Sequence, residues 1–559
     1  MKYENVFSLL EEITIKNSEK ISLGIKTSLG WNEFSYAGLG LLARRLACHL
    51  INDLKIEKGE KAAILSESRP ELGACVFGSA LAGMILVPLD NKLTIYELTS
   101  ILSDCLPSVL LVSAANYEKA VELKNTIPSI KHVILMENTK VEDNIETLYS
   151  IPKVYQAKWV RRPLNDTIFI IYTSGTTGSP KGVQITFKNM LAQMHDLRIV
   201  FSEILPRMEN VRGLSILPMN HLFELTVGFF IFLNMGFSIY YAKSLKPKDI
   251  LQAMAEKKIY FMITVPAFLK LLKSYIEAEL SKQSPAKQKM FKMNYELAKY
   301  MPLSVKKVMF KDIHEMFGGE FYGFLSGGAP LDKSVGDFFN RIGVNIFQGY
   351  GLSEASPVVS IDYGKDRDIK SVGPALKSIE AKIEKDTGEL MVKGPSVMKG
   401  YYHRDDLTAE AITPDGWLHT GDIAKIDPKT GRIYITGRIK NMIVLSGGKK
   451  VFPEEVEAVL EKSPYFADVC VMGMQKTFGE KDGCEGIVAI IVPTKDFVSK
   501  FSDFKEVEAA VIKEVKDLSK KLANYKRPVN IVVREENLPR TSTNKISRKE
   551  IKQMLPSMV

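Results

Sequence analysis

The chain has 559 residues, too many for one compact core, so two or more domains are expected. Its hydrophobic fraction of 45% and charged fraction of 25% are those of an ordinary soluble globular protein. The net charge of +10 fits a polyanionic partner, namely nucleic acid, an anionic membrane surface or a nucleotide-bearing substrate, and lysine enrichment of the source proteome explains it equally well. No recognisable nucleic-acid module accompanies the charge, so no nucleic-acid partner is expected.

The cysteines and the apolar segments indicate in which cellular compartment the protein is expected. The five cysteines are scattered, odd in number and free of CxxC pairs, which indicates reduced thiols and argues against a metal cluster or disulfide framework. The first residues lack the pattern of a signal peptide. The longest apolar stretch, 227–241, is interrupted by Asn234, Gly236 and Ser238 and is shorter than the roughly 20 residues that span a bilayer. We expect a cytoplasmic protein, with this stretch forming a buried helix that runs into a strand.

Helical and strand patterns alternate from about residue 35, which predicts parallel βαβ units. Helices are expected over 36–50, 72–82 and 97–104, and strands over 61–66, 84–89 and 108–112. Further βα patterns cover 214–308 and 321–349, and short strands at 379–383 and 388–392 suggest a β-rich cap. Residues 441–559 read as a small α/β unit, with strands near 443–445, 469–471 and 487–492 and helices near 453–462 and 504–524.

The most informative segment is 172–183, YTSGTTGSPKGV, which follows the apolar stretch 168–171. Its glycines permit close backbone approach to an anion, its hydroxyls donate hydrogen bonds, and Lys181 adds a compact positive charge. No Gly-Lys-Ser/Thr closes it, so it is not a Walker A loop. A plain turn between two core elements is the alternative. The candidate phosphate-binding residues are Thr173, Ser174, Gly175, Thr176, Thr177, Gly178 and Lys181.

A second segment, 347–354, reads FQGYGLSE and follows a predicted strand. Tyr350 could stack on a purine, and Glu354 could hold Mg²⁺ beside phosphates. Taken alone, the same residues are typical of a helix start with Ser353 as its cap.

Five more segments complete a pattern that resembles the acyl-adenylate-forming superfamily, which includes acyl-CoA synthetases, adenylation domains of peptide synthetases and beetle luciferases. The resemblance covers about residues 10–550. The segments are LPMNHLFE (217–224), SGGAP (326–330), GWLHTGD (416–422), GRIK (437–440) and LPRTSTNK (538–545).

The resemblance implies an α/β fold with a large N-terminal domain (1–437) of βαβ subdomains plus the β-rich cap, a hinge (438–440) and a small mobile C-terminal α/β domain (441–559). It implies an ATP cleft bordered by Gly328 and lined by His221, with Lys440 as the hinge pivot. Two positions depart from the usual pattern: Ser353 stands where Thr is common, and Asn544 where Gly is common.

The resemblance also assigns roles to individual residues. Lys545, Glu354 and His221 are the implied catalytic residues, and Mg²⁺ is expected at Glu354 and Ser174. Lys545 is expected to bridge the carboxylate and the α-phosphate, and Asp422 to accept hydrogen bonds from the ribose hydroxyls. Besides the residues of segment 172–183, the implied ATP-binding residues are Gly328, Gln348, Gly349, Tyr350, Ser353, Asp422 and Arg438.

Within the superfamily, the segment 317–319 leading into 325–331 and an extra segment, 274–311, look like the long-chain fatty-acyl branch. The expected function is therefore ATP-dependent activation of a fatty acid through acyl-AMP, with transfer to CoA. Three alternatives stay open: transfer to a holo acyl carrier protein, a luciferase-like monooxygenase, and a non-catalytic acyl-nucleotide-binding protein.

The extra segment has a composition of its own. Met290, Met293, Leu297 and Met301 recur at helical spacing, with lysines around them. Such a helix could rest on an anionic membrane, where acyl substrates partition, so a peripheral membrane contact stays open. The alternative is a helix that covers its own domain.

Overall fold

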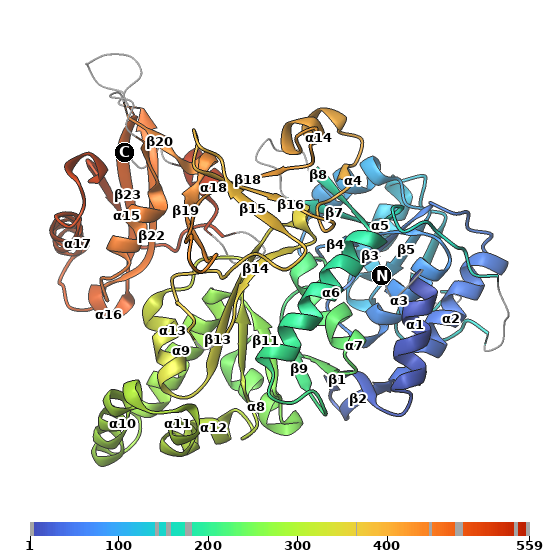
Figure 1. Ribbon diagram of the computed structural model, residues 1–559, viewed down its shortest axis with the longest axis horizontal. Helices are drawn as coiled ribbons and strands as arrows, with labels where there is room; N and C mark the ends of the chain where they lie inside the picture. The colour runs from blue at the N-terminus through green and yellow to red at the C-terminus, as the bar shows by residue number, and fades with distance from the viewer. Residues whose placement is uncertain are drawn as a thin grey trace. The chain divides into compact units, whose positions relative to one another are not determined.

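The computed structural model describes residues 5–139, 145–152, 158–173, 181–364, 366–445, 450–475, 485–540 and 546–554. The chain divides into two compact units. The first consists of Met1–Ala381, Val392–Leu418 and Lys429–Arg432, and the second of Lys382–Met391, His419–Pro428 and Ile433–Val559. Both units mix helices and strands (Figure 1), and the predicted α/β fold class is confirmed.

The first unit contains a seven-stranded sheet. Its strands are β3 (Lys61–Leu65), β4 (Ile85–Leu89), β5 (Val109–Val112), β6 (His132–Leu135), β7 (Thr167–Thr173), β8 (Lys181–Thr186) and β17 (Gly400–Tyr401). They follow the order β17-β8-β7-β4-β3-β5-β6. The run from β7 to β6 is parallel, whereas β8 and β17 pair antiparallel at one end. The predicted strands 61–66, 84–89 and 108–112 are thereby confirmed as β3, β4 and β5.

A second sheet in the same unit has eight strands. They are β1 (Ile21–Thr27), β2 (Gly30–Ser35), β9 (Arg212–Ser215), β10 (Ser238–Tyr241), β11 (Phe261–Thr264), β12 (Gly323–Ser326), β13 (Asn345–Gly351) and β14 (Val358–Asp362). Their order is β14-β13-β12-β11-β9-β10-β1-β2, with antiparallel pairs only at the two edges. The carboxyl ends of the parallel strands therefore share one edge, where ligands bind in sheets of this kind.

Helices fill the layer between the two sheets. This part of the unit includes α1 (Val6–Lys16), α2 (Tyr36–Asn52), α3 (Pro70–Leu81), α6 (Phe187–Ile204), the π-helix η2 (Phe223–Ile231) and α7 (Phe232–Asn234). Phe230 of η2 lies 6.0 Å from Phe169 of β7, and Phe201 of α6 lies 5.6 Å from Phe261 of β11, both edge to face. Since these aromatic pairs join the helices to strands of both sheets, one buried core connects the two sheets.

The outer faces of the sheets are covered as well. Leu98 of α4 (Ile95–Cys105) and Leu123 of α5 (Tyr117–Thr126) pack on the seven-stranded sheet. The short helix η1 (Ala114–Asn116) directly precedes α5. Leu269 and Phe338 pack on the eight-stranded sheet. The helices on that side are α8 (Pro247–Lys257), α9 (Pro266–Ser281), α10 (Pro285–Leu297), η3 (Ala298–Tyr300), α11 (Leu303–Met309), α12 (Lys311–Met316) and α13 (Lys333–Arg341).

The predicted β-rich segment forms a four-stranded sheet of order β15-β16-β18-β19. Its strands are β15 (Glu380–Ile383), β16 (Glu389–Lys393), β18 (Leu418–Ile426) and β19 (Ile433–Arg438). The short helix η4 (Ser353–Ala355) follows β13, and α14 (Asp405–Ala411) follows β17.

The rest of the second unit forms a small α/β unit, as the sequence predicts. Its strands are β20 (Ile443–Val444), β21 (Lys450–Val451), β22 (Phe466–Gln475), β23 (Glu485–Pro493) and β24 (Asn530–Val533), and its helices η5 (Ile439–Asn441), α15 (Pro453–Leu460), α16 (Lys495–Val498), α17 (Phe504–Ser519), η6 (Asn524–Lys526) and α18 (Arg548–Met554). The prediction that α17 continues to residue 524 is wrong. The chain turns after Ser519, and η6 forms separately just ahead of Pro528, where a helix cannot continue.

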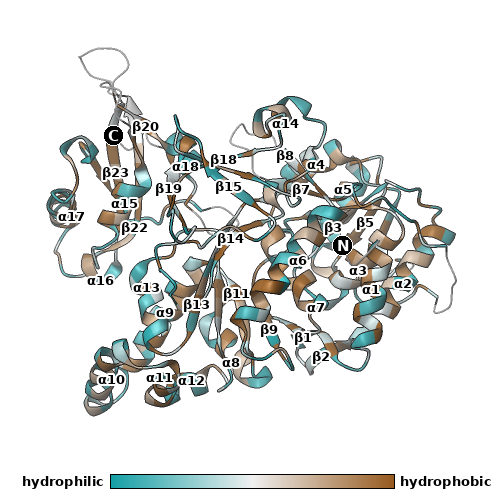
Figure 2. Ribbon diagram, viewed as in Figure 1, coloured by the Kyte–Doolittle hydropathy of each residue, from teal (hydrophilic) through white to brown (hydrophobic). Residues whose placement is uncertain are grey.

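Hydropathy follows this arrangement. Figure 2 shows hydrophobic residues concentrated in elements such as α7 and β13, while α13 and α17 present mostly hydrophilic residues. Stretch 227–241 lies in η2, α7 and β10, so the predicted buried helix and strand are confirmed. Among the helices that the structure describes, none is both long and apolar enough to cross a bilayer.

Candidate active site

The two ends of the predicted phosphate loop face each other across a strand pair. Thr173 closes β7 and Lys181 opens β8, and the two residues lie directly opposite in the register. The Thr173 hydroxyl donates a hydrogen bond to the Lys181 carbonyl at 3.5 Å. Ser174, Gly175, Thr176, Thr177 and Gly178 lie outside the described residues. The loop therefore starts at the carboxyl end of a parallel strand, where phosphate sites are common in α/β folds.

Lys181 and Glu354 are joined through Tyr401. The Lys181 Nζ atom lies 5.4 Å from the centroid of the Tyr401 ring, a cation–π geometry. The Tyr401 hydroxyl donates a 2.8 Å hydrogen bond to Glu354 Oε1. The Glu354 carbonyl in turn accepts the backbone N–H of Met398 at 2.8 Å. Lys181 and Glu354, which lie far apart in the sequence, thus both interact with the side chain of Tyr401.

Tyr401 is a site residue that the sequence does not reveal. It reaches the site because β17 pairs antiparallel with β8, with Tyr401 opposite Val183. Burial raises the pKa of the Tyr401 phenol above its ordinary range, and the charge of Glu354 raises it further, so the phenol stays a hydrogen-bond donor. Only the pairing of two strands more than 200 residues apart in sequence brings it there, and no local motif signals this.

Glu354 has the donor chemistry of a magnesium ligand. Because Mg²⁺ in nucleotide sites is usually bound by one or two carboxylates plus phosphates and water, one carboxylate suits it. Among the described residues, no group of three or more acidic, histidine or cysteine side chains could hold a metal by itself. Glu354 therefore fits an ion that a nucleotide brings with it, rather than an ion caged by protein alone. The second expected ligand, Ser174, is outside the described residues.

The carboxyl ends of β12 and β13 place two more motifs side by side. Ser326 pairs with Gln348 across these strands, so the turn at Gly328 lies beside Gly349 and Tyr350. Gly328 has φ = +83°, a left-handed conformation that favours glycine. The predicted adenine and acyl-border residues are therefore neighbours at the ligand-binding edge of the sheet. The alternative that makes Ser353 a helix cap is wrong, because Ser353 lies inside η4, whose N-cap position is Leu352.

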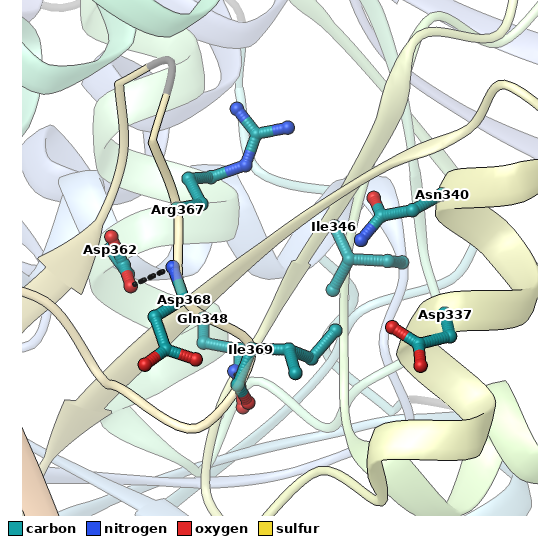
Figure 3. A pocket seen from close by; sticks show the side chains of 8 residues that line it. All are labelled: Asp337, Asn340, Ile346, Gln348, Asp362, Arg367, Asp368 and Ile369. Atoms are coloured by element: carbon teal, nitrogen blue, oxygen red, sulfur yellow. Dashed lines mark hydrogen bonds between the residues drawn. The ribbon is translucent and has the colours of Figure 1, made fainter. Parts of the chain in front are cut away.

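Gln348 also lines a cavity of about 280 Å³ on the α13 side of the sheet (Figure 3). Its side-chain amide donates hydrogen bonds to the carbonyls of Ile369 at 2.5 Å and Ser371 at 3.3 Å. The side chain is thus held against the segment 369–371. The residues lining the cavity are Asp337, Asn340, Ile346, Gln348, Asp362, Arg367, Asp368 and Ile369.

His221 lies in a turn at the start of η2. Its N–H donates to the Pro218 carbonyl at 3.2 Å, and its carbonyl accepts the Leu225 N–H at 3.0 Å. Two residues on, the Phe223 ring approaches Gly327, where an added Cβ would lie 3.1 Å from the ring. The segment 217–224 therefore reaches the same strand ends as the Gly328 turn.

Glu224, in the same segment, is a buried carboxyl group that is not among the predicted site residues. Only 2% of Glu224 is exposed, and a Cβ added at Gly228 would lie 2.4 Å from its Oε1 atom, so glycine is required one turn away. Burial raises the pKa of Glu224 to about 7, and the Ser215 hydroxyl opposes this rise.

The buried Glu224 should make stability depend on pH. Between the ordinary pKa of 4.5 and about 7, the folded chain holds a proton that the unfolded chain has lost, so stability falls as the pH rises. Glu224→Gln removes this dependence. Between pH 5 and pH 8, the free energy of unfolding of the variant relative to the wild type is expected to rise by about 1–3 kcal/mol. The measurement is the difference in melting temperature between variant and wild type as a function of pH. A difference that stays constant over this range would contradict the assignment.

The second unit holds the predicted ribose site. Asp422 of β18 lies opposite Arg438 of β19, and Arg438 Nε donates to Asp422 Oδ1 at 2.5 Å. The Asp422 side chain is 4% exposed and the Arg438 side chain is 58% exposed. The arginine therefore orients a buried acceptor, and most of its own side chain stays accessible to solvent. Lys440 follows in η5, and Lys545 lies outside the described residues.

Comparison with protein families gives two matches. A family described as "AMP-binding enzyme" matches residues 16–402, and one described as "AMP-binding enzyme C-terminal domain" matches residues 455–545. The first match contains Lys181, Glu354 and Tyr401.

Comparison with individual proteins agrees. The chain is 29% identical over 472 residues to long-chain-fatty-acid--CoA ligase FadD15 of Mycobacterium bovis, covering 80% of this chain and 76% of that protein. It is 28% identical over 552 residues to long-chain-fatty-acid--CoA ligase of Escherichia coli, covering 91% and 88%. The crystal structure of ATP-bound MatB from Rhodopseudomonas palustris matches with a TM-score of 0.78 and 23% identity, covering 98% of this chain and 99% of that one, a likeness of fold.

Proposed function

Because the chain belongs to the AMP-binding enzyme family, we propose that it activates a long-chain fatty acid with ATP and transfers the acyl group to CoA. The observation that carries the proposal is the Lys181–Tyr401–Glu354 arrangement beside the phosphate loop. The choice of a long-chain acid is supported by relatives of that name that align over most of the chain.

The first proposed step joins two anions. A carboxylate oxygen of the acid attacks the α-phosphorus of ATP, the bond to the β-phosphate oxygen breaks, and pyrophosphate leaves with that electron pair. Catalysis of such a step consists mainly of positioning and charge neutralisation. Lys181 and the 174–178 loop are proposed to hold the phosphates, and Lys545 to bridge the carboxylate and the α-phosphate.

Glu354 is the proposed magnesium ligand, together with Ser174. The ion, when bound with the nucleotide, neutralises phosphate charge. The Tyr401 hydroxyl fixes one oxygen of Glu354 and so orients the other. Gly328, Gln348, Gly349, Tyr350 and Ser353 are proposed to surround the adenine and the neighbouring phosphates.

Asp422 and Arg438 are proposed to bind the ribose. Asp422 has two oxygens with several lone pairs, so it can accept the ribose hydroxyls while it keeps its bond to Arg438. His221 is proposed to border the reacting acyl group. Lys440 is proposed to be the residue about which the C-terminal domain rotates between the two half-reactions.

The second proposed step consumes the acyl-AMP. The CoA thiolate attacks the acyl carbon, the acyl–phosphate bond breaks, and AMP leaves with the oxygen. A mass-spectrometric assay with palmitate, ATP, Mg²⁺ and either CoA or holo acyl carrier protein tests the acceptor. Palmitoyl-CoA and AMP in equal amounts are expected, and acylation of the carrier protein in place of CoA would overturn this acceptor while keeping the first step.

A peripheral contact with a membrane is proposed separately, from the exposed surface of α10 and α11.

A further inference from the structure

Helices α10 and α11, with the short helix η3 between them, carry a group of exposed apolar side chains. We call it the α10–α11 surface, and it consists of Met290, Met293, Leu297, Tyr300, Leu303, Val305 and Val308. Tyr300 is 77% exposed and Val308 76%. These seven are among nineteen exposed large apolar side chains in the described part of the chain, and they fall within 19 consecutive residues. Such clustering differs from the singly scattered apolar residues of an ordinary surface.

Helix α10 has two apolar faces, and the first unit covers only one of them. Phe291 and Tyr295, four residues apart, pack inward, with Phe291 5.5 Å from Phe310 and Tyr295 6.1 Å from Phe338. Met290, Met293 and Leu297 follow the spacing i, i+3, i+7 of a second stripe and are 53%, 58% and 48% exposed. The role of a helix that covers its own domain explains the face of Phe291 and Tyr295. It does not explain the exposed face of Met290, Met293 and Leu297.

The charge of this segment is strongly positive. Eight lysines and one glutamate lie between residues 282 and 311, a net charge of +7 in a chain whose total is +10. Lys287 and Lys289 flank the apolar stripe of α10 by helical geometry, and Lys292 lies next to Lys289. All three are exposed, and within the described residues no carboxylate pairs with them. By contrast, Lys282 is paired with Glu279 at 2.7 Å.

The two helices are bonded to each other. The Asn294 amide of α10 donates a hydrogen bond to the Met309 carbonyl of α11 at 3.3 Å. Figure 1 shows α10, α11 and α12 together at an edge of the first unit. At the turn between the helices, Lys299 Nζ lies 5.4 Å from the centroid of the Tyr300 ring, so a cation and an exposed aromatic ring share this turn. Tyrosine is enriched where proteins meet the membrane interface.

We propose that the α10–α11 surface docks on the surface of an anionic lipid bilayer. Exposed methionine, leucine and valine side chains gain by entering the boundary between headgroups and acyl chains, and the flanking lysines pair with anionic headgroups. A nucleic acid would match the charge but would leave the apolar stripe in water. The inference stands on this surface alone and does not depend on which acid the enzyme activates.

The test is co-sedimentation of the full-length protein with lipid vesicles. One set of vesicles is phosphatidylcholine alone, and the other contains about 30% phosphatidylglycerol, an anionic lipid. Binding to the anionic vesicles only, and weaker at high salt, is expected. Lys287→Gln with Lys289→Gln and Lys292→Gln should weaken this binding at least ~10-fold, and Met293→Ser with Leu297→Ser should weaken it comparably.

The matched control is Lys505→Gln with Lys513→Gln and Lys516→Gln on α17, three exposed lysines whose loss changes the net charge equally. This control should keep full binding. Equal loss in the control and in the α10 lysine variant would show a mere effect of net charge and overturn the proposal. Absence of wild-type binding, binding that the α10 variants leave intact, or a concentration-dependent dimer abolished by the Met293 and Leu297 changes would overturn it too.

Discussion

Replacing Lys545 with alanine is expected to slow formation of the acyl-adenylate by at least ~10²–10³, since one charge-stabilising donor at a transition state contributes about this much. Conversion of preformed acyl-AMP to the thioester should stay largely intact, because the CoA thiolate attacks the neutral acyl carbon and no longer has to approach the α-phosphate that Lys545 is proposed to neutralise. The two half-reactions are measured separately, by ATP–pyrophosphate exchange and by mixing acyl-AMP with CoA.

The control for Lys545 is Lys549→Ala. Lys549 lies four residues later in α18 and is exposed, so the change removes the same charge and the same side-chain stem from the same region. It should alter neither half-reaction. If Lys545→Ala reduced both half-reactions equally, the assignment of Lys545 to the first step and of Lys440 to the pivot would be wrong.

Replacing Glu354 with glutamine is expected to reduce acyl-adenylate formation by ~10²–10³ and to raise the Mg²⁺ concentration needed for half-maximal rate, because the carboxylate loses its charge while keeping its shape. Tyr401→Phe is expected to have a smaller effect of the same kind, a loss of about 10- to 100-fold, since a hydrogen bond to a charged group contributes about 1.5–3 kcal/mol. The measurement is the rate of exchange as a function of Mg²⁺ concentration.

Tyr402→Phe is the matched control for Tyr401. It makes the same chemical change in the adjacent residue, whose ring stacks on His403 at 3.9 Å. Tyr402→Phe should leave the Mg²⁺ dependence unchanged. A Tyr401→Phe enzyme with a normal rate at every Mg²⁺ concentration would show that the hydrogen bond to Glu354 does not position a metal ligand.

Much of the fold follows from local patterns. Buried strands such as β3 to β5 are continuous apolar runs, and helices such as α2 carry apolar residues at helical spacing, so both are readable from the sequence. The π-helical form of η2 is not readable in this way, because its residues are apolar nearly all round and no periodicity distinguishes it from an ordinary buried α-helix. The division of the chain also needs the structure: residues 382–391 and 419–428 belong to the second unit.

The site was predicted motif by motif, and the structure supplies how the motifs meet. Thr173 and Lys181 are opposite in register, Ser326 pairs with Gln348, and Asp422 pairs with Arg438. The first pairing joins the two ends of segment 172–183, and the other two join residues of separate motifs. The role of Tyr401 depends on a strand pairing across a long stretch of sequence, for which no residue spacing gives a signal. The roles of all the site residues stay predictions, and Ser174 and Lys545 also lie outside the described residues.

The most direct test of the proposed function is ATP–pyrophosphate exchange with carboxylic acids from acetate to oleate, run without any thiol acceptor. Exchange that rises with chain length and peaks at long-chain acids is the predicted result, and it would establish the adenylate step and the substrate class together. Exchange that peaks with short or aromatic acids would contradict the long-chain assignment, and absence of exchange with every acid would contradict the adenylation itself.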